Sequence, residues 1–122
     1  MKSIFRFLLA KARAVGATQA IVENVGAADG DYLQAIADSL KGEFKGVVVL
    51  GATSNGSVAL LATVSPEFTK QFQAGKLIQA IAPIIGGKGG GRPDNARGGG
   101  KEAGKLDEAL AKAAELLGKS PV

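Results

Sequence analysis

Two apolar segments joined by a tight turn occupy the middle of the chain. GVVVLGAT and SVALLATV lie within residues 46–65 and are rich in β-branched and other apolar residues. Asn55 and Gly56 join them, and this dipeptide favours a type I′ turn because both turn positions require positive φ. Since both segments are apolar at nearly every position, we expect them to be covered on both faces. The pattern predicts an antiparallel hairpin at the centre of a sheet.

The other periodic segments predict the elements that would surround this hairpin. Residues 19–25 favour a strand, and apolar positions recur at helical spacing over residues 33–40, 77–85 and 106–117. Pro83 should kink or end the second of these helices. The length of 122 residues agrees with one domain. We therefore expect a single small α/β domain, with a mixed sheet whose central antiparallel hairpin is packed by helices.

The first fifteen residues differ in charge from the rest of the chain. They contain four basic residues, no acidic residue and an approximate apolar stripe. We expect a short helix over residues 1–15, followed by a globular domain over residues 16–122. A secretory signal is disfavoured because Arg6 interrupts the apolar run and Lys11 and Arg13 follow it at once. No run approaches the roughly 20 apolar residues of a membrane span, so no membrane partner is expected.

The composition excludes most kinds of catalytic site. The chain has no Cys and no His, which rules out a thiolate nucleophile, a Ser-His-Asp triad and a metal ligated by Cys or His. Asp29 with Asp31 and Asp107 with Glu108 are the close carboxylate pairs. They are better explained as helix caps and as acids in the first turn of a helix. We expect no catalytic residue, no metal site and no cofactor.

Eight of the 18 glycines lie in one basic segment, GGKGGGRPDNARGGGK, at residues 86–101. Glycine exposes backbone N–H groups, which together with interleaved cations can recognise phosphate; a flexible surface loop is the alternative. The P-loop motif fails because Leu106 stands where its Ser or Thr belongs, and GxGxxG is absent. We expect a basic, Gly-rich loop. The glycines expected to shape it are Gly86, Gly87, Gly89, Gly90, Gly91, Gly98, Gly99 and Gly100.

This segment resembles the signature of a known domain family. GGKGGGRPDNARGGG, with VVLGATSNGSVALLATVS before it and KLDEALAKA after it, is similar to the DHH-associated domain at the C-terminus of alanyl-tRNA synthetase, which some phosphoesterases share. The resemblance covers residues 18–117. The phosphoesterase branch typically has a histidine in this segment. This chain has Arg92-Pro93-Asp94 instead, which favours the synthetase branch.

The resemblance implies a non-catalytic, tRNA-binding domain of a cytoplasmic ligase. By that likeness it would contact the outer corner of tRNA and support aminoacylation and editing. Its partners would be alanine-specific tRNA and the catalytic and editing domains of a longer chain. Residues 1–15 would be the end of a helical segment through which a homodimer could form.

The same resemblance supplies candidate contacts to tRNA phosphates. These are Lys88, Arg92, Arg97 and Lys101. The Arg92-Pro93-Asp94 turn could instead be structural, with Asp94 pairing Arg92 or capping the turn. Two other functions stay open at this point: a dimerisation or assembly module, and a substrate-binding accessory domain of a DHH-type phosphoesterase.

Overall fold

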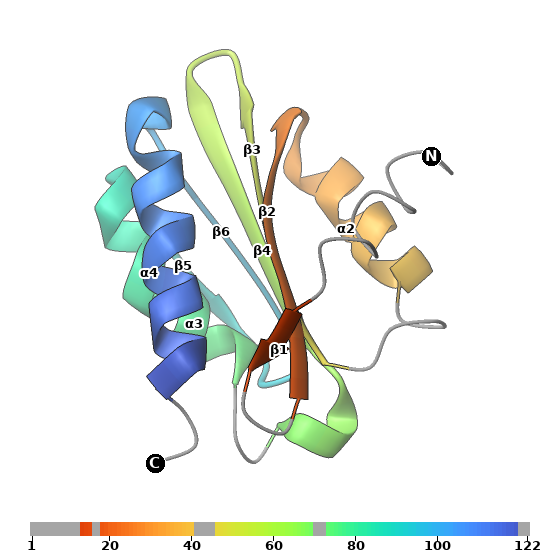
Figure 1. The fold of residues 1–122 in the computed structure, drawn as a ribbon. Coiled ribbons are helices and arrows are strands. Elements are labelled where there is room, and N and C mark those ends of the chain that lie inside the picture. Colours follow the sequence, from red (N-terminus) through yellow and green to blue (C-terminus); the bar gives the residue numbers. More distant parts are fainter. Residues whose placement is uncertain (1–12, 16–17, 41–45, 70–72, 120–122) are drawn as a thin grey trace.

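The fold is a six-stranded sheet with helices on both faces (Figure 1). The computed structural model describes residues 13–15, 18–40, 46–69 and 73–119. The strands are β1 (Arg13–Val15), β2 (Thr18–Ala27), β3 (Val47–Ser54), β4 (Ser57–Val64), β5 (Lys88–Gly91) and β6 (Asn95–Gly100). The α-helices are α2 (Gly30–Leu40), α3 (Ala74–Ile81) and α4 (Leu106–Lys119). Three short 3₁₀ turns are η1 (Pro66–Phe68), η2 (Ala82–Ile85) and η3 (Ala103–Lys105).

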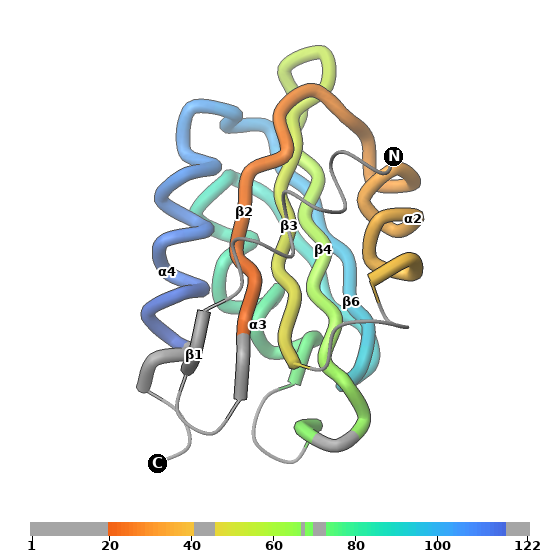
Figure 2. The backbone as a smooth tube through the Cα atoms, turned by 45° about the vertical axis from the view of Figure 1, so that its right-hand side comes forward, coloured from red at the N-terminus to blue at the C-terminus, as the bar shows by residue number. Residues whose placement is uncertain are grey.

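The sheet is mixed, and its strand order is β1-β2-β3-β4-β6-β5. Strands β2 and β3 are parallel, whereas every other neighbouring pair is antiparallel. Helix α2 covers one face of the sheet, and α3 and α4 cover the opposite face (Figures 1 and 2). This arrangement confirms the predicted α/β class, the mixed sheet and the central antiparallel hairpin.

Two apolar clusters hold the layers together, one on each face of the sheet. Along β3, Val47 and Val49 belong to the cluster under α3 and α4, whereas Val48 and Leu50 belong to the cluster under α2. Residues of a strand alternate between its two faces, so a strand that is covered on both faces must be apolar throughout. The expectation that this hairpin is covered on both faces is therefore confirmed.

The turn of the central hairpin has the predicted geometry. The β3–β4 ladder runs from the Val47–Val64 pair to the Ser54–Ser57 pair without a break in register. Asn55 and Gly56 have φ values of 51° and 81°, in the left-handed region that a type I′ turn requires.

Helix α2 begins at a side-chain cap. The Asp29 carboxylate accepts a hydrogen bond from the Tyr32 backbone N–H at 2.9 Å, and the Leu33 N–H donates to the Asp29 carbonyl at 3.2 Å. The predicted capping role is confirmed for Asp29. Asp31 is different, because its carboxylate pairs with Arg97 of β6 instead.

Helix α3 ends where proline requires it to end. Pro83 has no N–H to donate to the carbonyl of Gln79, so the α-helix stops at Ile81 and the chain continues as the 3₁₀ turn η2. The helix also begins at Ala74, three residues before the predicted start. Ile85, the last apolar residue of the predicted helix, lies in η2 and is still buried against the sheet.

The N-terminal segment does not follow the prediction where the structure describes it. Residues Arg13–Val15 form strand β1, which pairs antiparallel with β2 through Arg13–Ala20 and Val15–Thr18. The helix expected over residues 1–15 is wrong for these three residues, because β2 offers backbone partners to a neighbouring strand. Residues 1–12 lie outside the described part of the chain.

The Asp29 cap gives the first prediction. Replacing Asp29 with Ala leaves the Tyr32 N–H without its acceptor, so we expect the free energy of unfolding to fall by about 1 kcal/mol. Asp29→Ser keeps a capping oxygen and should lose much less. Denaturant unfolding of the two variants checks this, and an equal loss in both would contradict the capping role.

Candidate nucleic-acid interface

The basic, Gly-rich segment is a β-hairpin and not the loop that the sequence predicts. Strands β5 and β6 pair from Lys88–Gly99 to Gly91–Ala96, and β6 also pairs with β4. Strand β5 therefore forms an edge of the sheet. Glycine is normally depleted in strands, and tertiary packing overrides that propensity here.

The glycines allow α3 to lie directly on the hairpin backbone. A Cβ atom on Gly89 would lie 2.5 Å from the Ile78 Cγ2 atom, and one on Gly98 would lie 2.8 Å from the same atom. At the start of α3, a Cβ on Gly75 would lie 2.7 Å from the carbonyl oxygen of Gly91. All of these distances are too short for a real carbon atom. These glycines make close packing possible, so neither a flexible loop nor an open phosphate cradle describes them.

Glycines at the other end of the hairpin have similar roles. Gly86 ends η2 with φ of 70°, a conformation that glycine adopts without strain. A Cβ on Gly87 would collide with the Gly99 carbonyl oxygen, and one on Gly100 with the Ile85 carbonyl oxygen.

Gly90 lies in the middle of the hairpin, in β5, where Arg97 is its partner across the ladder.

The turn at Arg92-Pro93-Asp94 has a structural backbone. The carbonyls of Pro93 and Arg92 accept hydrogen bonds from the Ala74 and Gly75 N–H groups at 2.7 and 3.2 Å. The turn thus satisfies two of the N–H groups at the start of α3, which a helix cannot bond internally. These groups are consequently occupied by protein and do not face a ligand.

The Arg92 side chain is separate from this backbone role. Its Nε lies 3.7 Å from the Asp94 carboxylate, and the side chain is 78% exposed. The choice that the sequence left open, between a structural and a binding turn, is therefore answered for the backbone only. The guanidinium itself remains accessible to a partner.

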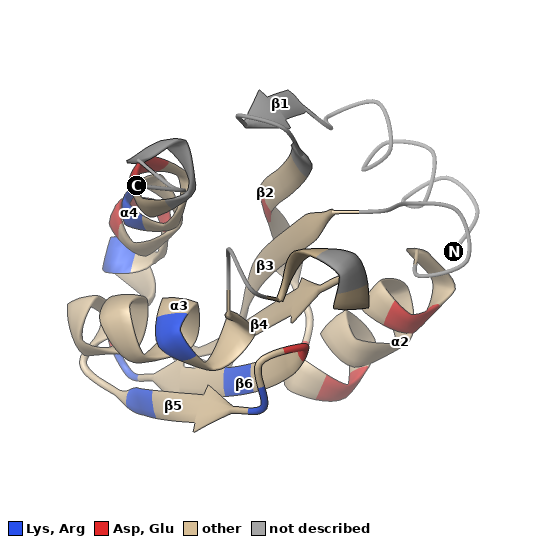
Figure 3. Cartoon of the chain, turned by 90° about the horizontal axis from the view of Figure 1, so that it is seen from below, with Lys and Arg blue, Asp and Glu red and all other residues tan. Residues whose placement is uncertain are grey.

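The predicted cations lie along the hairpin without meeting at one point. Lys88 opens β5 and Arg92 follows its last residue, so about 13 Å of strand separates them at about 3.3 Å per residue. Lys101 follows β6 at the same end as Lys88, because Lys88 pairs with Gly99. Lys88 and Lys101 are both exposed. Figure 3 shows basic positions on β5, on β6 and on the adjacent α3.

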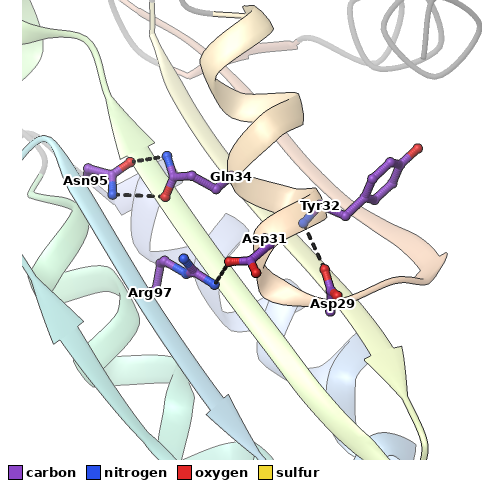
Figure 4. A network of polar contacts seen from close by, with 6 residues as sticks. All are labelled: Asp29, Asp31, Tyr32, Gln34, Asn95 and Arg97. Atoms are coloured by element: carbon purple, nitrogen blue, oxygen red, sulfur yellow. Dashed lines mark hydrogen bonds and ion pairs between the residues drawn. The ribbon is translucent and has the colours of Figure 1, made fainter.

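A polar network, which the sequence did not predict, links this hairpin to α2 (Figure 4). The Arg97 guanidinium lies 3.3 Å from the Asp31 carboxylate. The side-chain amides of Gln34 and Asn95 exchange two hydrogen bonds of 3.1 and 3.3 Å. The paired residues are 66 and 61 positions apart, so no local pattern could have brought them together.

The described residues contain no group of three or more His, Cys, Asp or Glu side chains that could hold a metal ion. Within the same part of the chain, no helix has the length and apolar character needed to cross a membrane.

The contact between Ile78 and the hairpin backbone gives the second prediction. Gly98→Ala places a methyl group against Ile78 Cγ2 and the Lys88 carbonyl, so we expect it to lower the free energy of unfolding by about 1–3 kcal/mol. Gly104→Ala is the matched control, because a Cβ there would meet nothing within 4 Å. Thermal and denaturant unfolding measure both. Equal stability of the two variants would contradict the close packing.

Comparison with known proteins identifies the family. The model of the DHHA1 domain matches residues 17–119. The chain is 41% identical over 102 residues to an alanine–tRNA ligase of Solibacter usitatus, a match over 83% of this chain and 12% of that protein. It is 43% identical over 114 residues to the alanine–tRNA ligase of Synechocystis sp., a match over 90% of this chain and 13% of that protein. The chain therefore spans about an eighth of the length of these relatives.

A solved structure shows the same fold. The C-Ala domain of Aquifex aeolicus alanyl-tRNA synthetase superposes with a TM-score of 0.80 at 28% identity, over 88% of this chain and 98% of that domain. The expected resemblance is thus confirmed in both sequence and structure. The chain belongs to the DHHA1 domain family, and within it the chain is similar to the C-terminal domain of alanyl-tRNA synthetase.

Proposed function

We propose that this domain binds the sugar–phosphate backbone of tRNA through the exposed side of the β5–β6 hairpin. The observation that carries the proposal is a well-packed hairpin at a sheet edge with exposed cations at both of its ends. Residues 86–101 contain four cations and one acid, so most of the net charge of +4 that the 122-residue chain carries lies in this short segment. Clustered cations of this kind raise the local concentration of a polyanion.

The packing of the hairpin supports this proposal. A mobile loop loses backbone conformational entropy when it binds, in addition to that of its side chains, whereas a backbone already held by the fold loses little more. Here the hairpin is bonded to β4 on one side, and its turn is bonded to the start of α3. The backbone positions of Lys88, Arg92 and Lys101 relative to one another are therefore set by the fold before any RNA binds.

The contact should depend on charge and shape. Among the residues whose side-chain burial the structure describes, Tyr32 is the only exposed large hydrophobic one. RNA-binding modules that read single strands need several aromatic side chains on which bases stack. A surface without such a platform is suited to phosphates on a folded RNA, such as the outer corner of tRNA.

The relatives suggest the setting in which this binding would be used. They are named alanine–tRNA ligases, and this chain corresponds to a small part of them. We propose that the domain has no catalytic role of its own and holds alanine-specific tRNA while other domains of a longer chain aminoacylate and edit it.

The proposal predicts a change in the salt dependence of binding. The triple variant Lys88→Gln, Arg92→Gln, Lys101→Gln should bind tRNA more weakly. The slope of log K against log salt concentration should also become shallower by about two to three, because each lost phosphate contact contributes slightly less than one. Fluorescence anisotropy with labelled whole tRNA at several salt concentrations measures both quantities.

A matched pair of single variants separates the hairpin from general charge. Arg92→Gln and Lys112→Gln each remove one positive charge, and Lys112 lies on α4 beside Glu115 at 3.9 Å. We expect Arg92→Gln to lower the affinity for tRNA and to make the slope of log K against log salt concentration shallower. Lys112→Gln should change neither quantity much. Equal effects of the two variants, or an unchanged slope in the folded triple variant, would argue against this interface.

A further inference from the structure

We infer that Asp31 of α2 acts as an internal competitor for Arg97, so that a phosphate and the Asp31 carboxylate compete for this guanidinium. The inference rests on the proposed function of the hairpin and concerns one cation within it. Its consequence is that Asp31 lowers the affinity of the domain for RNA. Asp31 would be a positioning residue that touches Arg97 and not the RNA.

The register of the sheet sets the direction of Arg97. It lies opposite Leu61 of β4, and Leu61 belongs to the apolar cluster under α2. Its neighbour Ala96 belongs to the cluster under α3 and α4. Arg97 therefore points to the α2 side of the sheet, where the first turn of α2 lies (Figure 4).

Gly30 lets the guanidinium lie directly against the helix backbone. A Cβ atom at this position would collide with the Arg97 Nη2 atom. The carboxylate of the next residue, Asp31, accepts a hydrogen bond from this same nitrogen at 3.3 Å. One turn along, the Gln34–Asn95 amide pair joins the same two elements. Helix α2 is thus held at β6 with its acid beside the cation.

The pair is weak enough to be exchanged. The Asp31 side chain is 91% exposed and that of Arg97 is 44% exposed, so water screens their attraction. Ion pairs at such exposure change an equilibrium by about fivefold at most. A phosphate group can take its place, because two of its oxygens can accept charge-assisted hydrogen bonds from the guanidinium in a bidentate contact. The negative charge of Asp31 also repels an approaching phosphate.

The hairpin cations differ in this respect. Arg92 has its acid, Asp94, within its own turn at 3.7 Å, whereas Arg97 is paired across the gap between two elements. The Arg97–Asp31 contact consequently depends on the relative position of α2 and β6. A polyanion that engages Arg97 has to compete with a partner that the fold itself supplies.

A double-mutant cycle tests this inference. Asp31→Asn should raise the affinity for whole tRNA by about two- to fivefold, and Asp31→Glu should restore the wild-type value. In the Arg97→Gln background, the gain from Asp31→Asn should largely disappear, because there is no guanidinium left to release. Glu108→Gln on α4 makes the same change in net charge and should leave the affinity nearly unchanged.

A second measurement does not depend on RNA. The NMR signal of the Arg97 Nε–H group can be followed while inorganic tripolyphosphate is added at constant ionic strength. The half-saturating concentration should be about two- to fivefold lower in Asp31→Asn than in the wild type. An equal concentration in both proteins would overturn the competition.

The two measurements distinguish the possible failures. If the domain binds tRNA but Asp31→Asn brings no gain, or an equal gain without Arg97, the competition is overturned and the proposed function stands. If the domain does not bind tRNA at all, the proposed function fails, and the tripolyphosphate titration alone decides whether Asp31 competes for Arg97.

Discussion

The Ile78 side chain packs against the bare backbone of β5 and β6, and this contact fixes the edge of the sheet that carries the basic hairpin. Gly89 and Gly98 allow it, because a Cβ on either residue would occupy the position of the isoleucine methyl group. Through it, α3 fixes an edge hairpin that has almost no side chains of its own to bury. A hairpin held in this way can present lysine and arginine to solvent without losing its shape.

The two sides of the hairpin consequently have different roles. On the α3 side, glycines and Ala96 close against the core. On the α2 side, Arg97 reaches Asp31, and Asn95 reaches Gln34. The first side contributes stability through packing. The second side holds Arg97, whose exposed ion pair with Asp31 leaves its guanidinium accessible. Arg97 thus both joins β6 to α2 and belongs to the proposed binding surface.

Much of the fold could be predicted from the sequence, because its central strands are continuous apolar segments and its helices have apolar positions at helical spacing. The Asn55-Gly56 turn and the Pro83 helix end follow from backbone rules that act locally. The site was harder to predict. Glycine-rich composition indicated a loop, whereas pairing with β4 and packing against Ile78 make this segment a hairpin. Arg13–Val15 formed a strand because β2 accepts it, and the Arg97–Asp31 pair joins residues 66 positions apart. Such outcomes depend on partners that a local pattern does not contain.

The most direct test of the central claim maps the tRNA contact onto the fold. NMR chemical-shift changes of the isotope-labelled chain, recorded while whole tRNA is added, report each backbone position separately. We expect the largest changes along β5, β6 and the turn between them, with Lys88, Arg92, Arg97 and Lys101 among them, and little change on the exposed face of α4. Changes centred on α4, or none at saturating tRNA, would contradict it.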